Sequence, residues 1–300
     1  MFANKKIWSS LVLWFLFVPI IYAQSPQFKT FTNRQGLSTY NTRKIIQDNF
    51  GFLWIATQDG INRFDGTRFN VITKNTTAKI TLGGTFITDC CIDDKGLIWL
   101  GSEYGGVDVI NPADLSITKQ VRQNEKDGLI SNWVRAVCYN GSDEIWMGTY
   151  YGLSVLNKNT NNFTNLTLNY INKSEPLNIS CISRDSSSNM WLGIENEGLV
   201  VLNRKKEVIA IFDKHYFEMH AGTPLKIFGF YVDKKGVVFA CTNAGLKVFR
   251  PGNNTYTIDT TTAEYIPYRN MEVHTCLRDK QNNFWEIGRA SCRERVSVLV

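Results

Sequence analysis

Seven residues of the chain combine aromatic rings and cations in places where a binding surface could form. Trp133, Arg135 and Tyr150 stand within a single stretch of the chain. An aromatic ring can stack on the apolar face of a sugar, and a guanidinium can donate two parallel hydrogen bonds. We therefore expect a site for an acidic or neutral saccharide, the alternative being that these are solvated loop residues. The candidate ligand-binding residues are Arg43, Tyr104, Trp133, Arg135, Tyr150, Tyr151 and Lys226.

Sequence patterns for catalysis and metal binding are missing. His215 and His220 resemble a metal pair only superficially, because a five-residue step along a strand places the two imidazoles on opposite faces. The sequence contains no nucleophile elbow, phosphate loop or zinc-ligand spacing. We expect no catalytic residue, no metal and no cofactor, and no enzymatic activity in this segment.

The elements that must position the candidate residues come from a repeat. An aromatic anchor returns every 45 to 48 residues, and in three copies it is Trp followed by an apolar residue and Gly. A near-constant period of this length is typical of repeat architectures. The anchors are Trp54, Trp99, Trp146, Trp191, Phe239 and Trp285.

Each repeat contains four short strand patterns separated by turns. An acid or its amide stands six residues before each anchor and starts a tight turn, and a second turn follows the anchor strand. The turn residues are Asp48, Asp93, Asn140, Asp185, Asp233 and Asp279. Four antiparallel strands per repeat make a propeller blade. We predict an all-β fold, a β-propeller of five complete four-stranded blades and a truncated sixth, with the tryptophans in the blade core.

The blade topology predicts where the candidate residues lie. In a four-stranded antiparallel blade, the start of the innermost strand and the turn after the anchor strand open on the same face. Residues thirteen and eleven before each anchor are therefore expected at the mouth of the central channel, beside the turns that contain Tyr104, Tyr150 and Glu195. Residues 28–32 alternate like a strand without a blade of their own, and we expect them to close the ring.

Composition and charge limit the partners of this segment. The 300 residues carry a formal net charge of +6, part of which lies in Lys5, Lys6 and the C-terminal arginines. The longest basic run is residues 204–206, so we expect no nucleic-acid binding. The seven cysteines show no Cys-x-x-Cys spacing. They are predicted to be buried small hydrophobes, with disulfides or metal ligation as alternatives.

The N-terminal 23 residues have the features of a secretory signal. Lys5 and Lys6 precede an apolar stretch over residues 11–21, and Ala23 offers a small residue for cleavage. The alternative is an uncleaved anchor helix. In either case the repeats are expected outside the cytoplasm, in the periplasm.

One motif resembles a known family. Asn-x-x-Gly-Leu-Ser at residues 33–38 is followed by Ile-x-x-Asp-x-x-Gly-x-Leu-Trp-Ile-x-Thr-x-x-Gly-Ile-x-Arg-Phe-Asp-Gly at residues 45–66. This closely resembles the two-component regulator propeller repeat, which forms the periplasmic sensor region of hybrid two-component histidine kinases of Bacteroidota. The resemblance covers residues 28–285 and departs in the fifth repeat, where Phe239 and Cys241 replace Trp and Gly. It implies a seven-bladed ring, a second propeller and kinase domains downstream, and an oligosaccharide ligand.

These observations divide the chain into a signal peptide (1–23), a β-propeller sensor domain (24–285) and a tail (286–300) that we expect to be non-native, because the repeat stops in mid-strand. The expected function is ligand sensing by part of a hybrid histidine kinase that regulates transcription through downstream domains. The full-length protein is expected to be a homodimer anchored in the inner membrane. A secreted propeller enzyme acting on polysaccharide, a lyase or a glycosidase, is the alternative.

Overall fold

The computed structural model describes residues 29–74, 81–124, 128–166, 168, 177–217, 219, 222–252 and 255–288. The predicted signal segment and residues 289–300 of the predicted tail lie outside these ranges. Residues from Thr32 onward form one compact unit, and residues 29–31 belong to another. Within the described ranges, no helix is long and apolar enough to cross a membrane.

The described chain is almost entirely strand and turn. Blade one holds β1 (Thr42–Gln47), β2 (Leu53–Thr57), β3 (Gly60–Phe64) and β4 (Phe69–Ile72). Blade two holds β5 (Ile87–Ile92), β6 (Ile98–Ser102), β7 (Gly106–Ile110) and β8 (Ile117–Val121). Blade three holds β9 (Val134–Tyr139), β10 (Glu144–Thr149), β11 (Gly152–Asn157) and β12 (Phe163–Leu166).

The second half repeats the pattern and adds the short helices. Blade four holds β13 (Ile179–Arg184), β14 (Met190–Ile194), β15 (Gly198–Leu202) and β16 (Val208–Asp213). Blade five holds β17 (Ile227–Val232), β18 (Val238–Thr242), β19 (Gly245–Pro251) and β20 (Tyr256–Ile258). Blade six holds β21 (Val273–Arg278) and β22 (Phe284–Gly288). The 3₁₀ helices are η1 (Asn33–Gln35), η2 (Lys214–Phe217) and η3 (Ala263–Tyr268).

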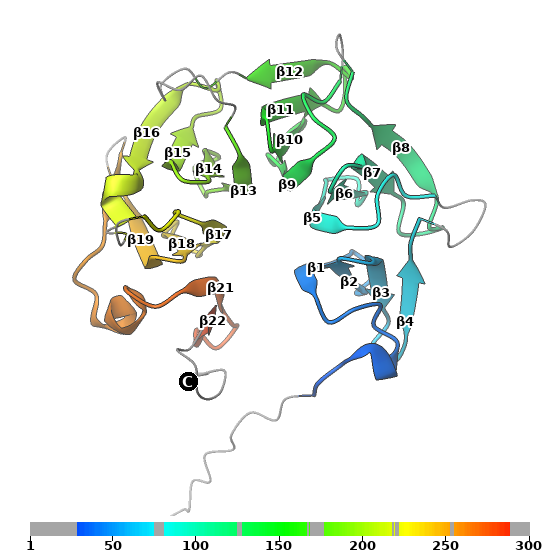
Figure 1. Cartoon of the computed structure of the whole chain (residues 1–300), viewed down its shortest axis with the longest axis horizontal. Helices are drawn as coiled ribbons and strands as arrows, with labels where there is room; N and C mark the ends of the chain where they lie inside the picture. The colour runs from blue at the N-terminus through cyan, green and yellow to red at the C-terminus, as the bar shows by residue number, and fades with distance from the viewer. Residues whose placement is uncertain are drawn as a thin grey trace, which may run out of the picture. The chain divides into compact units, whose positions relative to one another are not determined.

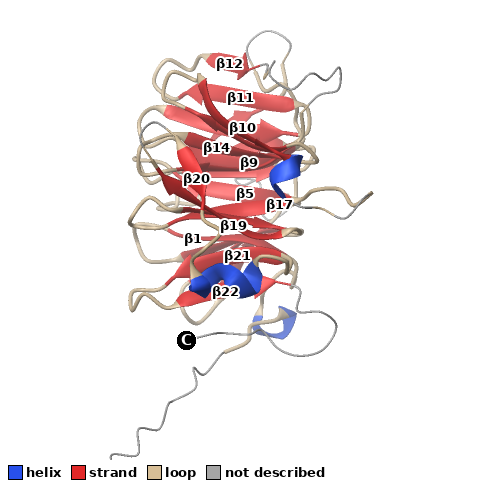
Figure 2. Cartoon of the chain, turned by 90° about the vertical axis from the view of Figure 1, so that its left-hand side faces the viewer, coloured by secondary structure: helices blue, strands red, loops and turns tan. Residues whose placement is uncertain are grey.

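Within each blade the strands pair antiparallel in sequence order, and the blades surround a common centre (Figure 1). Innermost strands of successive blades are neighbours, from β1 beside β5 to β17 beside β21. Seen from the side, the strands of the blades form stacked layers (Figure 2). The predicted all-β fold is confirmed, with five four-stranded sheets and a sixth of two described strands. This arrangement is consistent with a β-propeller.

Five of the six anchors are buried in the core between blades, as the repeat predicts, whereas Trp285 is half-buried. Trp146 is 1% exposed and packs against Ile179, Ile182 and Leu192 of blade four. Two residues later Gly148 leaves no room for a side chain, because a Cβ there would lie 2.6 Å from the Ile179 Cγ2 atom. Close approach of the blades therefore requires glycine at this position.

The recurring aspartate before an anchor stabilises the tight turn and, where the anchor is Trp, also binds its indole. In blade two, Asp93 Oδ1 accepts hydrogen bonds from the backbone amides of Lys95 and Leu97, each at 3.0 Å. The other oxygen, Oδ2, accepts the indole N–H of Trp99 at 3.1 Å. One carboxylate thus fixes the turn and orients the buried ring.

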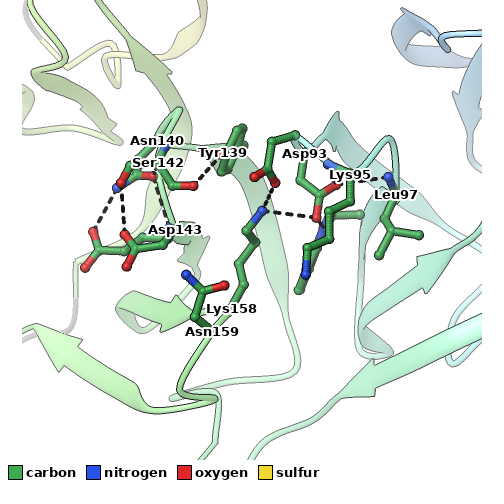
Figure 3. A network of polar contacts seen from close by, with 12 residues as sticks. Asp93, Lys95, Leu97, Tyr139, Asn140, Ser142, Asp143, Lys158 and Asn159 are labelled. Atoms are coloured by element: carbon green, nitrogen blue, oxygen red, sulfur yellow. Dashed lines mark hydrogen bonds and ion pairs between the residues drawn. The ribbon is translucent and has the colours of Figure 1, made fainter.

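Neighbouring blades also meet through these carboxylates. Lys158 of blade three reaches Asp93 of blade two, with Nζ 3.5 Å from Oδ2 (Figure 3). It also contacts Asp94. Its ammonium lies 4.5 Å from the centre of the Tyr139 ring. Only 6% of the Lys158 side chain is exposed, so this interaction is shielded from solvent.

Two sequence expectations are wrong in detail. Residues 29–32 form no strand; Thr32 instead caps η1 through its hydroxyl, and the Gln35 side chain accepts the Thr32 amide at 2.8 Å. This capping box uses the Thr32 N–H, the last backbone donor of the predicted strand. At the other end, β22 does not stop at Trp285 but continues through Gly288.

Glu286 nevertheless departs from the repeat. It is a buried carboxyl at a position that is apolar in other blades, for example Ile55, Leu100 and Met147. Burial raises the pKa of Glu286 above its usual range. Residues 286–288 therefore pair as a strand while breaking its residue pattern.

Candidate functional site

The predicted positions at the start of each innermost strand lie beside the predicted turns. In five blades, the backbone amide of the first turn residue donates to the carbonyl of the residue thirteen before the anchor. The pairs are Gln58 with Asn41, Glu103 with Phe86, Tyr150 with Trp133, Glu195 with Asn178 and Asn243 with Lys226, at 2.9 to 3.4 Å. We call this edge of the ring the rim. The prediction that both sets open on one face is confirmed.

Aromatic side chains gather on the rim of blades two and three. The Trp133 and Tyr150 rings stack with centroids 4.2 Å apart and an interplanar angle of 7°. Tyr104 lies 4.9 Å from Trp133, and Tyr151 packs its edge against Tyr150 at 5.2 Å. We call these four residues the aromatic cluster. Tyr104 is 67% exposed and Tyr151 is 49% exposed, so two of the four rings offer surface to solvent.

Tyr104 has an unusual backbone conformation. Its φ is +63°, in the left-handed region that bulky residues rarely occupy. The corresponding three-residue turn of blade four has Asn196 at φ +66°, a residue type that tolerates this region. Leu115 and Lys206 have similar φ values in other turns, so this conformation alone marks no site. At Tyr104 the ring lies beside Trp133.

A polar cluster continues the rim from blade three to blade four. The Arg135 guanidinium donates to Glu195 Oε2 at 2.6 Å and to Asn178 Oδ1 at 3.1 Å. Asn178 in turn donates to Glu195 Oε2 at 2.6 Å. About a third of the Arg135 side chain and less of Glu195 is exposed. The three side chains, which we call the polar cluster, are fixed by one another and present donors and acceptors at the rim.

Arg135 lies at a β-bulge, which redirects its side chain relative to the rest of the strand. The pairing of β9 with β10 skips one residue between Val134 and Ala136, so Arg135 is the extra residue. Bulges bend a strand and re-aim the side chain of the extra residue. The same shift occurs at the equivalent residue of every described blade: Arg43, Thr88, Ser180, Phe228 and His274.

The other predicted residues lie elsewhere on the ring. The Arg43 guanidinium stacks over the Phe86 ring at 5.0 Å, across blades one and two. Lys226 is exposed on blade five, where its amide donates to Asn243 Oδ1 at 2.8 Å. The structure therefore brings four of the seven predicted residues into contact, Tyr104, Trp133, Tyr150 and Tyr151. Arg135 contacts Asn178 and Glu195 of blade four instead.

An ion pair joins the inner strands of blades one and two. Lys44 Nζ lies 3.6 Å from Asp89 Oδ1, and this carboxylate raises the pKa of Lys44 above its ordinary value. Asp89 also accepts the backbone amide of Val137 from blade three at 3.0 Å. Asp89 thereby links three successive blades below the rim.

It was not predicted from the sequence that Glu195 and Asn178 would pair with Arg135. Their positions in the repeat could have indicated it. Asn178 and Glu195 occupy, in blade four, the same two places that Trp133 and Tyr150 occupy in blade three. At these two positions, two aromatic rings stack in blade three, whereas two polar side chains form a hydrogen bond in blade four.

Comparisons with known proteins agree with the fold. The chain is 20% identical to the extracellular domain of the hybrid two-component system BT3049 from B. thetaiotaomicron, with a TM-score of 0.55, over 86% of this chain and 40% of that one. It is 16% identical to the extracellular domain of BT4673 from the same organism, with a TM-score of 0.64, over 88% of this chain and 36% of that one. The WD40 repeats of RRP9 give a TM-score of 0.51 at 10% identity, over 85% and 89% of the two chains. Identities this low show the fold alone.

Sequence comparison reaches only part of the chain. A stretch of 74 residues, 24% of this chain, is 38% identical to histidine kinase P4 of Formosa agariphila and covers 5% of that protein. No family model matches the chain. The chain thus spans a small part of this kinase and about two fifths of the Bacteroides extracellular domains.

Proposed function

We propose that this chain is the ligand-binding part of an extracytoplasmic sensor of a two-component histidine kinase, and that its ligand is an oligosaccharide. The observation that carries the proposal is the aromatic cluster beside the polar cluster on one rim. Tyr104 and Tyr151 offer flat apolar surface, while Arg135, Asn178 and Glu195 offer donors and acceptors for hydroxyl groups. This combination of stacking surface and fixed polar groups is what saccharide recognition requires.

The likeness to extracellular domains of Bacteroides signalling systems supports the sensor class. The match to a histidine kinase over 74 residues points the same way. Signal output then belongs to kinase domains in the full-length protein, which we propose to be anchored in the inner membrane and homodimeric. The ring itself is proposed to close with seven blades.

The polar cluster favours a neutral saccharide over an acidic one. The Arg135 guanidinium is already paired with the Glu195 carboxylate at 2.6 Å. A uronic acid would have to approach that carboxylate and compete with it for Arg135, and juxtaposed like charges oppose binding. A neutral sugar can instead exchange hydroxyl hydrogen bonds with both partners.

A calorimetric screen tests the proposal. The chain is titrated with neutral xylo- and manno-oligosaccharides and with oligogalacturonates. We expect saturable binding of a neutral oligosaccharide without cleavage of its glycosidic bonds. Cleavage detected by chromatography would favour the polysaccharide-degrading enzyme instead, and absence of binding across a broad glycan panel would remove the proposal.

A further inference from the structure

Two cysteine sulfurs face each other between blades five and six. The Sγ atoms of Cys241, on β18, and Cys276, on β21, lie 3.5 Å apart. Cys241 is 1% exposed and Cys276 is 5% exposed. Both belong to the same hydrophobic cluster, in which Phe239 and Val273 also pack. The two thiols are separated by 35 residues of sequence but meet across one interface.

The position of Cys241 is special within the repeat. Blades two, three and four have Gly101, Gly148 and Gly193 there, and a Cβ at any of them would lie within 3 Å of a side chain of the next blade. In blade five this position holds Cys241, whose Sγ meets that of Cys276 in blade six. The equivalent contact between blades two and three joins Gly101 to Val137, whose Cγ2 would lie 2.7 Å from a Cβ at Gly101. Cys241 and Cys276 thus occupy the positions that Gly101 and Val137 hold there.

Blades five and six also lack contacts that other blades have. Phe239 has no indole N–H, so Asp233 holds only the backbone amides of Lys235 and Val237. Blade six contributes only two described strands to its sheet.

Two other cysteines donate to backbone carbonyls rather than to a second sulfur. The Sγ of Cys138 contacts the carbonyl oxygen of Tyr139, and the Sγ of Cys181 contacts that of Ile227.

We propose that Cys241 and Cys276 form a disulfide bond that joins blade five to blade six. Exported proteins form disulfides because their compartment is oxidising. Each thiol loses its hydrogen as the S–S bond forms, and the two electrons and two protons reduce the disulfide of a thiol–disulfide exchange partner to two thiols. This assignment adds a covalent modification to the chain and does not depend on which ligand the rim binds.

The bond forms during folding rather than afterwards. The adjacent Cys276 thiol and burial raise the pKa of Cys241 well above its usual value, which suppresses the thiolate that exchange requires. Exchange therefore precedes burial of the interface. Once the blades have packed, both sulfurs are shielded from reductants.

Peptide mapping tests the proposal directly. The full chain is reduced in denaturant and refolded with oxidised and reduced glutathione, then alkylated under denaturing, non-reducing conditions and digested. We expect a cross-linked peptide that contains Cys241 and Cys276. It should persist in Cys90→Ser, a matched buried control, and vanish in Cys276→Ser, which should leave Cys241 alkylated. Full alkylation of both cysteines in the wild type, or cross-links to other cysteines instead, overturns the proposal.

Thermal unfolding provides a second readout. Closing a 35-residue loop stabilises the folded chain. Reduction in denaturant followed by refolding with reductant present should therefore lower the Tm of the wild type by roughly 5 °C. In Cys276→Ser the same reduction should leave Tm unchanged. An equal response of the two proteins to reductant would contradict the bond.

Discussion

The indole nitrogen of Trp54 donates a hydrogen bond of 2.7 Å to Oδ2 of Asp48, six residues earlier and on the other side of a tight turn. The same bond joins Trp99, Trp191 and Trp285 to Asp93, Asp185 and Asp279. In blade three, Asn140 replaces the acid, and Glu144 accepts the Trp146 indole instead at 3.1 Å. A carboxylate thus accepts the indole N–H of every Trp anchor in the described blades.

Asp48→Ala should destabilise the chain more than the same change in blade five. Asp48 holds two backbone amides and an indole N–H in a buried place, and we expect a loss of roughly 3 kcal/mol in the free energy of unfolding. Asp233→Ala is the matched control. Because Phe239 offers no N–H, its cost should be lower by about 1–2 kcal/mol. Urea unfolding of both variants measures the difference, and equal losses would show that the indole bond contributes nothing.

Trp146→Ala should cost roughly 3–5 kcal/mol, because it empties the space between blades three and four. In repeat proteins each repeat is stabilised by its interfaces with its neighbours. Amide hydrogen exchange should therefore accelerate in blade three and in blade four. Trp133→Ala removes a half-buried Trp from the rim and should cost clearly less. Similar losses for the two variants would contradict the assignment of Trp146 to the core.

Stability at alkaline pH should depend on Tyr256. Burial, with the Asp185 carboxylate to which its hydroxyl donates, raises the pKa of Tyr256 to about 12. The folded state therefore holds this proton more tightly than the unfolded state. The resulting stability is complete below pH of about 10 and is lost as pH rises toward 12.

Urea unfolding at several pH values checks this for the wild type and Tyr256→Phe. The wild type should lose stability more steeply above pH 10, whereas below it the gap between the two proteins should stay constant. Tyr216→Phe, a change at an exposed tyrosine, serves as control and should follow the wild type. Parallel curves for Tyr256→Phe and the wild type would contradict the hydrogen bond to Asp185.

Glu195→Gln should change the ligand preference of the rim. The substitution keeps the shape of the side chain but removes the charge that pairs with Arg135. The freed guanidinium should then favour an oligogalacturonate, with affinity gained roughly tenfold and falling as salt increases. Glu103→Gln, at the equivalent turn of blade two, is the control. Unaltered selectivity in calorimetric titrations of Glu195→Gln would place Arg135 outside the site.

The sequence predicts the blades well because each blade is local. Anchors, turn acids and strand alternation lie within one period, so the residue pattern alone is enough to assign Trp54, Trp99, Trp146 and Trp191 to the core, where all four are buried. The turn role of Asp48 follows from the same pattern. Its bond to Trp54 does not, because the residue spacing alone does not show where the second carboxylate oxygen points.

Contacts between blades are harder to predict. Lys158 meets Asp93 across 65 residues, and Arg135 meets Glu195 across 60. Both depend on how two blades are rotated against each other, which the pattern of a single repeat does not encode. The predicted closing strand fails at its C-terminal end, where the capping box of Thr32 and Gln35 starts a 3₁₀ helix instead.

The central claim is tested most directly by calorimetric titration of the neutral oligosaccharide that the screen identifies. Its affinity is compared between the wild type and the double variant Tyr104→Ala with Tyr151→Ala, which removes the two exposed rings of the aromatic cluster. Each stacked ring contributes on the order of 1 kcal/mol, so the double variant should bind at least roughly tenfold more weakly. Tyr216→Ala, at an exposed tyrosine of η2, is the control and should bind like the wild type. A Kd for the folded double variant equal to that of the wild type would contradict saccharide binding at this rim.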